Sequence, residues 1–152
     1  MINWYSNKKI GIYFSDIPLV GVRYVLPSMA DEEKRGIKKY PFICKKELQV
    51  KLVDYKKKKH YKFTVPKGYC YDGASIPRFF WRVIGSSTDN QFLIPALIHD
   101  VLCEHHNYVD NDRAFSTNVF NALLEVSGVG KLKRFCMKNS VGLFQTVCSS
   151  WK

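Results

Sequence analysis

Alternating side chains in the first half of the chain predict a β-hairpin. Every second residue from Leu48 through Val50 to Leu52 is apolar and would face one side of a strand, while the residues between them would face the other side. The same alternation resumes over 60–65, after four lysines at 56–59. A period of two on both sides of a polar turn predicts two antiparallel strands with one buried face. Pro66 should end the second strand, because proline has no amide hydrogen to donate to the ladder.

Upstream of the hairpin the pattern is shorter and less regular. Residues 10–14 and 19–25 are rich in β-branched and aromatic side chains, and Asp16 and Pro18 separate them. They predict two further strands. Residues 28–39 are polar and of mixed charge, and they predict a surface loop with room for a short helical turn.

The second half carries helical periodicity. One apolar stripe runs over about 93–104, with Pro95 near its first turn. A second runs over about 112–127, where Asp112 or Asn111 could cap the start and Gly128 supplies a stop. A third helix is expected over about 131–147, with its lysines outward.

Strands followed by helices predict an α+β fold: an N-terminal antiparallel sheet with a hairpin, and three C-terminal helices packed on it. A length of 152 residues with 46% hydrophobic content fits one domain over 1–152. Within it, residues 1–45 form a strand-rich extension and residues 46–150 the core.

Composition indicates the cellular compartment of the protein and the kinds of partner it could bind. Five cysteines are an odd number and form no Cys-x-x-Cys pair, which indicates buried thiols in a reducing cytosol. No apolar run reaches the roughly 18 residues of a spanning helix, and no targeting pattern opens the chain. The net charge of +11 would favour nucleic acid, an anionic membrane surface or an acidic protein as a partner. The alternative is a basic surface that has no specific role.

Several candidate metal-ligating or catalytic residues lie on the helix predicted over 93–104. His99, Cys103 and His106 fall at i, i+4 and i+7 on one face, opposite the apolar stripe, with Asp100 at its edge. Such a set could hold zinc, with Asp72 or Asp112 completing the shell. An imidazole beside a carboxylate could also act as a general base. The alternative is a hydrogen-bonded structural pair, and we expect no cofactor.

The segment 71–78 is the second candidate. Asp72, Gly73 and small residues after them predict a tight turn, whose backbone amides could face an anion or be capped by the Asp72 side chain. Ser75 is a possible nucleophile only if this turn folds over the helix that carries His99. No Gly-x-Ser-x-Gly elbow or phosphate-binding loop is present.

Lys56, Lys57, Lys58 and Lys59 form a third candidate, a nucleic-acid contact at the hairpin tip. Exposed aromatics, which single-strand binders place among their lysines, are not interleaved with these in the sequence. Lysines at a hairpin tip also keep sheet edges from associating.

Read together, these segments resemble a family found in phages and prophages, domain of unknown function 1353 (DUF1353). The resemblance rests on Val65-Pro66-Lys67-Gly68-Tyr69, on Asp72-Gly73-Ala74-Ser75-Ile76-Pro77-Arg78, on Trp81 and on His99-Asp100-x-Leu102. It covers roughly residues 60–130. It implies a viral setting and, by analogy, a hydrolase-like pocket with Asp72, Ser75, His99 and Asp100 as catalytic candidates.

The chain departs from the family pattern at one polar position. Where the family has Ala-Asp four residues after its arginine, this chain has Ser116 and Thr117 after Arg113. A carboxylate of that polar cluster is therefore missing, which favours a structural role.

The resulting hypothesis is a virion-associated structural or assembly protein, a docking module of a capsid, portal or tail. Its partners would be other virion proteins, and it would be found in the virion and in the host cytoplasm during assembly. One alternative is a small metal-assisted or acid–base hydrolase that acts on cell-wall material. The other is a basic accessory protein that binds nucleic acid.

Overall fold

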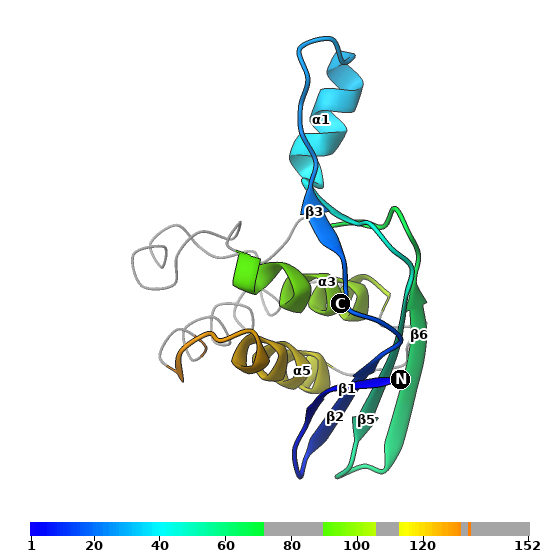
Figure 1. Ribbon diagram of the computed structural model, residues 1–152, viewed down its shortest axis with the longest axis vertical. Coiled ribbons are helices and arrows are strands. Elements are labelled where there is room, and N and C mark those ends of the chain that lie inside the picture. Colours follow the sequence, from blue (N-terminus) through cyan, green and yellow to red (C-terminus); the bar gives the residue numbers. More distant parts are fainter. Residues whose placement is uncertain (72–89, 106–112, 132–133, 135–152) are drawn as a thin grey trace.

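The computed structural model describes residues 1–71, 90–105, 113–131 and 134. Its main sheet has four antiparallel strands in the order β1-β2-β5-β6 (Figure 1). They are β1 (Ile2–Ser6), β2 (Ile10–Phe14), β5 (Leu48–Asp54) and β6 (Lys59–Val65). The predicted hairpin is confirmed as β5 and β6, with Leu48 opposite Val65 and Asp54 opposite Lys59.

A smaller sheet lies beside the main one, in the order β3-β4-β7. Its strands are β3 (Val20–Val22), β4 (Phe42–Cys44) and β7 (Cys70–Tyr71). The sequence pattern did not reveal β1, β4 and β7, because each is short or only half-buried and shows no clear alternation. The two-residue strand β7 forms because Tyr71 pairs with Phe42 of β4, a residue far from it in the sequence.

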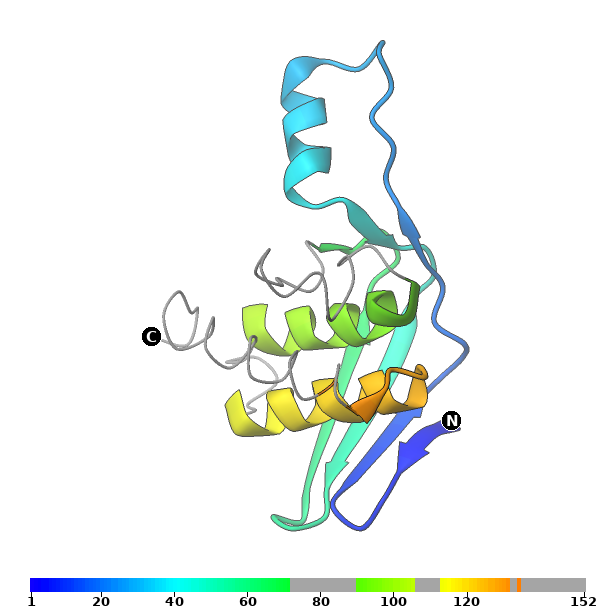
Figure 2. The same cartoon turned by 90° about the vertical axis from the view of Figure 1, so that its left-hand side faces the viewer.

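Between β3 and β4 the chain forms an arm, residues 23–41, which projects away from both sheets (Figures 1 and 2). It contains the helix α1 (Asp31–Lys39), where the sequence led us to expect a loop with a short helical turn. The helix is longer than the short turn that we expected. Acidic residues in its first turn and basic residues in its last complement the helix dipole, and they stabilise a helix that buries only Ile37.

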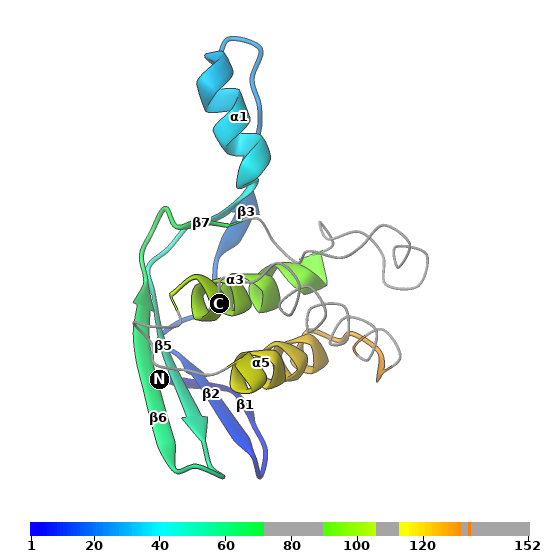
Figure 3. The same ribbon diagram turned by 180° about the vertical axis from the view of Figure 1, so that it is seen from behind.

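Two antiparallel helices, α3 (Asn90–Glu104) and α5 (Arg113–Val126), cover one face of the main sheet (Figures 2 and 3). Both confirm predicted helices. The third, expected over 131–147, lies almost wholly outside the described residues. Gly128 ends α5 as predicted: its φ is +88°, and the amide of Val129 donates to the carbonyl of Leu124 at 3.0 Å.

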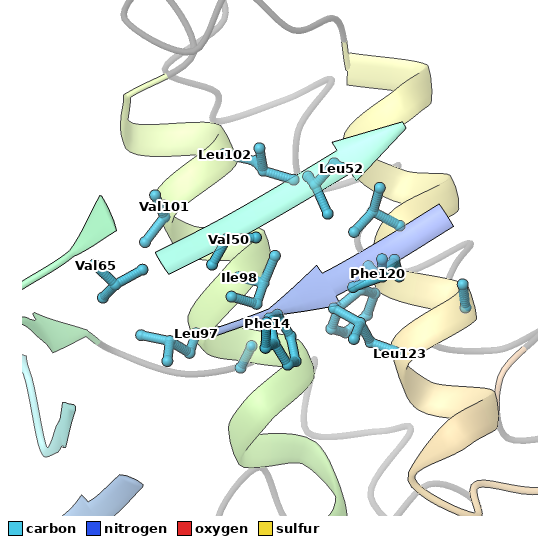
Figure 4. Packing of buried hydrophobic residues seen from close by; sticks show 14 of the residues in the cluster. Phe14, Val50, Leu52, Val65, Leu97, Ile98, Val101, Leu102, Phe120 and Leu123 are labelled. Atoms are coloured by element: carbon cyan, nitrogen blue, oxygen red, sulfur yellow. The ribbon is translucent and has the colours of Figure 1, made fainter. Parts of the chain in front are cut away.

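The core fills the space between the sheet and these helices (Figure 4). Alternate residues of β2, β5 and β6 point inward and are buried, among them Phe14, Val50 and Leu52. Leu97 and Ile98 of α3 meet them, as do Phe120 and Leu123 of α5. Strands of period two and helices of period 3.6 therefore bury their apolar sides against each other.

Truncating a side chain in this layer should be costly. Leu97 is fully buried, so Leu97→Ala should lower the free energy of unfolding by about 2–5 kcal/mol, through lost burial and the cavity left behind. Leu26 of the arm is 53% exposed, so Leu26→Ala should change it by less than about 0.5 kcal/mol. Urea unfolding followed by circular dichroism measures both. Equal effects would contradict this placement of the core.

Candidate functional site

The predicted catalytic residue His99 lies in the middle of α3, on the side that faces α5. Only 8% of the residue is exposed. Its ring packs on Phe120 of α5 with centroids 4.8 Å apart, and its Nε2 lies 3.5 Å from the Sγ of Cys103, one turn later. The sequence placed His99 and Cys103 opposite the apolar stripe. In the structure a second helix covers that face, so both residues lie between helices.

Burial controls the protonation of His99. Desolvation disfavours the imidazolium and lowers the pKa of His99 from 6.5 to about 4. At neutral pH the ring is uncharged, so one ring nitrogen donates and the other accepts. A base of such low pKa is weak at neutral pH, which favours a packing and hydrogen-bonding role.

The polar neighbourhood of this helix includes Asp100, on α3 itself, and Tyr71 of β7. Tyr71 is fully buried, and its hydroxyl donates to the carbonyl of Leu93 at 2.9 Å, which joins β7 to the first turns of α3. Burial raises the pKa of Tyr71 far above its ordinary value, and the nearby charge of half-buried Asp100 adds to the effect. Sequence reasoning placed Tyr71 at the start of the candidate segment 71–78 but did not predict its contact with α3, since only the fold brings the two together.

The contact between Tyr69 and Glu104 extends this link. The hydroxyl of Tyr69 donates to Oε2 of Glu104 at 2.8 Å, at the far end of α3. Two tyrosines two residues apart thus tie the segment around β7 to both ends of α3. The segment that leads into the predicted turn is therefore connected to the helix of His99 at two points.

Thr117, where the resemblance led us to expect a carboxylate, is directed into its own helix. Its hydroxyl donates to the carbonyl of Arg113 at 3.0 Å, and the hydroxyl of Ser116 donates to the same carbonyl at 2.8 Å. Such bonds to the preceding turn are usual for hydroxyl side chains in helices.

The predicted zinc site has only part of its ligands within the described residues. His99 and Cys103 are close together, but His106 and Asp112 lie outside the described ranges, as do Asp72 and Ser75. Within the described ranges no three His, Cys, Asp or Glu side chains gather as metal ligands would. The catalytic and zinc hypotheses stay predictions.

The lysines form a second candidate surface, larger than the sequence indicated. Lys56–Lys59 lie at the turn between β5 and β6, and the turn between β1 and β2 beside it carries Lys8 and Lys9. The two turns touch: the amide of Tyr55 donates to the carbonyl of Lys9 at 3.0 Å. Asp54 stabilises the turn between β5 and β6, since its Oδ1 accepts hydrogen bonds from the amides of Lys56 and Lys57.

A groove of about 490 Å³ opens between these two turns and α5. Lys9, Lys56 and Lys57 line one side, and Asn118 and Asn121 of α5 line the other. The two asparagines lie three residues apart on the polar face of α5. Periodicity predicted that face, but only the packing of α5 beside the turns directs it at the lysines.

Comparison with known proteins assigns a family to one segment of the chain. The family described as a protein of unknown function (DUF1353) matches residues 48–141, more than half of the chain. The chain belongs to the DUF1353 family. The match begins at β5, earlier than the sequence motifs indicated, and it includes β6, β7, α3 and α5.

One relative of this DUF1353 chain is an uncharacterized protein, y4jT, of Sinorhizobium fredii. The two are 41% identical over 51 residues, which are 34% of this chain and 15% of that protein. The chain thus matches only a small part of that relative's length. No solved structure matches the chain.

The DUF1353 match leaves out β1 to β4 and the arm. Nevertheless β2 pairs with β5 along its whole length, so this N-terminal segment completes the sheet of the family core. None of the described helices has the length and apolar character needed to cross a membrane.

The lowered pKa of His99 predicts a pH dependence of stability. The unfolded chain takes up a proton near pH 6.5, whereas the folded chain does so only near pH 4. The free energy of unfolding should therefore fall as the pH drops through this window, by up to roughly 3 kcal/mol. His99→Leu removes the titrating group and should flatten the curve between about pH 6.5 and pH 5.

Urea unfolding at several pH values measures this effect. His60→Gln is the matched control, because His60 lies exposed on β6, and it should leave the slope unchanged. If the wild type and His99→Leu share one pH dependence, His99 does not titrate as its burial requires.

Proposed function

We propose that this protein is an assembly protein of a phage or prophage particle, and that it docks on a neighbouring subunit through its arm. The observation that carries the proposal is the row of exposed apolar side chains at the base and first part of the arm. Tyr24 is 76% exposed, and its neighbours Val25 and Leu26 are exposed as well. Ile17, Leu19 and Val22 continue the row toward the main sheet.

Single exposed apolar residues are ordinary, but a contiguous group marks an interaction surface. Six of them within residues 17–26 leave a strip of chain that no described residue buries. The cost of this exposure is recovered when a partner covers the strip. Its backbone is held at the base of the arm, where β3 pairs with β4 and the amide of Arg23 donates to the carbonyl of Pro41 at 2.7 Å.

Charge supports a subunit contact at the same place. The first turn of α1 places Asp31, Glu32 and Glu33 near the tip of the arm, whereas the whole chain carries a net charge of +11. An acidic tip on a basic protein favours a basic neighbour, which includes a second copy of this chain. The phage setting itself comes from the resemblance to the family.

The arm is also separate from the segment that the family shares. The family match begins at residue 48, after β4. A projection added outside a common core is a usual way to give one member its own partner. The buried state of His99 is compatible with this function, because a docking module needs the polar core for packing and not for turnover.

Particle association tests the proposal. Particles produced by the host cell that expresses the chain are purified on a density gradient, and the chain is quantified in them by mass spectrometry. The double variant Tyr24→Ser, Leu26→Ser should reduce its amount by about tenfold or more, because it removes two apolar contacts from the interface.

Val126→Ser is the matched control, since Val126 is a similarly exposed apolar residue at the end of α5. It should leave association unchanged, and circular dichroism should show both variants folded. If the wild-type chain is absent from particles, the assembly role is wrong. If the double variant associates as well as the wild type, the arm is not the docking element.

Sedimentation of the purified chain separates the two kinds of neighbour. If the arm binds a second copy, the wild type sediments as an oligomer and the double variant as a monomer. If it binds a different subunit, both sediment as monomers while only the wild type associates with particles.

A further inference from the structure

The outward face of the main sheet, opposite α3 and α5, carries a pattern that the packing of the core does not explain. Strand register aligns Asn3, Tyr13, Lys51 and Lys62 in one row across all four strands. No described helix or strand lies over this face (Figures 1 and 3). Lys62 is exposed, and Tyr13 and Lys51 are half-buried.

Two tyrosines meet above the next row. The hydroxyls of Tyr13 and Tyr55 lie 3.2 Å apart, and both side chains extend over Gly11. A Cβ at Gly11 would lie 2.9 Å from the Tyr55 hydroxyl and 3.0 Å from the Tyr13 ring. The glycine therefore allows both aromatic side chains to lie low on the sheet, as a platform with Tyr55 still 41% exposed.

Lysines surround this platform. The Nζ of Lys51 lies 5.6 Å from the centroid of the Tyr13 ring, and Lys62 is the cross-strand neighbour of Lys51. The turn between β1 and β2, which adjoins Tyr55, adds exposed Lys8, whereas Lys9 and Lys56 line the groove against α5. Among the described strand positions that face outward there is no carboxylate, so the charge on this face is of one sign.

We propose that this outward face binds single-stranded nucleic acid. Bases stack on the platform of Tyr13 and Tyr55, and the phosphates between them contact Lys51, Lys62 and Lys8. Aromatic side chains on an open sheet, bordered by cations, are the combination that single-strand binding proteins use. Tyr55 adjoins Lys56 along the sequence, whereas Tyr13 reaches Lys51 only through the pairing of β2 with β5.

A single strand fits this surface better than a duplex. Side chains that lie low on a sheet offer ring surface to an unstacked base, whereas the bases of a duplex are already stacked on each other. The described part of this face offers no projecting helix or strand that would enter a groove. Binding should therefore tolerate different sequences and depend on salt.

Fluorescence anisotropy with labelled oligonucleotides tests the proposal. The probes are single-stranded oligo(dT), single-stranded oligo(rU), and a DNA duplex of equal length. The full chain should bind the single strands more tightly than the duplex at low salt. The double variant Tyr13→Leu, Tyr55→Leu should weaken single-strand binding by about fivefold or more, the loss expected when base stacking is removed.

A second variant separates the phosphate contacts from the stacking. Lys51→Gln, Lys62→Gln should reduce the slope of log affinity against log salt by about 0.7 for each lysine that contacts a phosphate. The matched control Arg35→Gln, Lys38→Gln removes the same charge from exposed positions of α1, and it should change neither the affinity nor the slope. Circular dichroism confirms that each variant is folded.

Photocrosslinking with an iodouracil-substituted oligonucleotide gives a readout that charge alone does not produce. Crosslinked peptides should contain Tyr13 or Tyr55. Equal affinity for the duplex, an equal loss in the α1 control, crosslinks only elsewhere, or no binding at low salt would each overturn the proposal. Whichever of oligo(dT) and oligo(rU) binds more tightly identifies the type of strand.

Discussion

The rest of this structure depends on the pairing between β2 and β5. These strands pair over five residues each, from Ile10 opposite Asp54 to Phe14 opposite Val50. The pairing joins a segment outside the family match to the first strand inside it. It widens the hairpin β5–β6 into a sheet broad enough to lie under two helices. Because side chains alternate along each strand, it also creates two extended faces at once.

The two faces of that sheet have different roles. The inward face is apolar and packs on α3 and α5, and this packing buries His99 against Phe120 and keeps its imidazole uncharged. The outward face carries tyrosines and lysines in register. The arm extends beyond both. His99 is thus buried, while the features suited to binding lie on the outward face and on the arm.

Much of the fold could be predicted from local pattern. The hairpin β5–β6, the helices α3 and α5, and the stop at Gly128 each follow from a periodicity or a turn residue within one segment of chain. The misses share a cause. The strands β1, β4 and β7 exist through pairing with distant partners, and α1 carries too few apolar residues for its periodicity to stand out.

The candidate sites show the same division more sharply. The sequence by itself determined the family segment, the α+β class and the helical face shared by His99 and Cys103, because these depend on residue identity and spacing along one element. Only the tertiary structure decided that α5 covers that face, that Tyr71 reaches the first turns of α3, and that Tyr13 lies beside Lys51 and Tyr55. The physical reason is that burial, pKa and cross-strand neighbours depend on which elements pack together, and the spacing within one element carries no information about its partner.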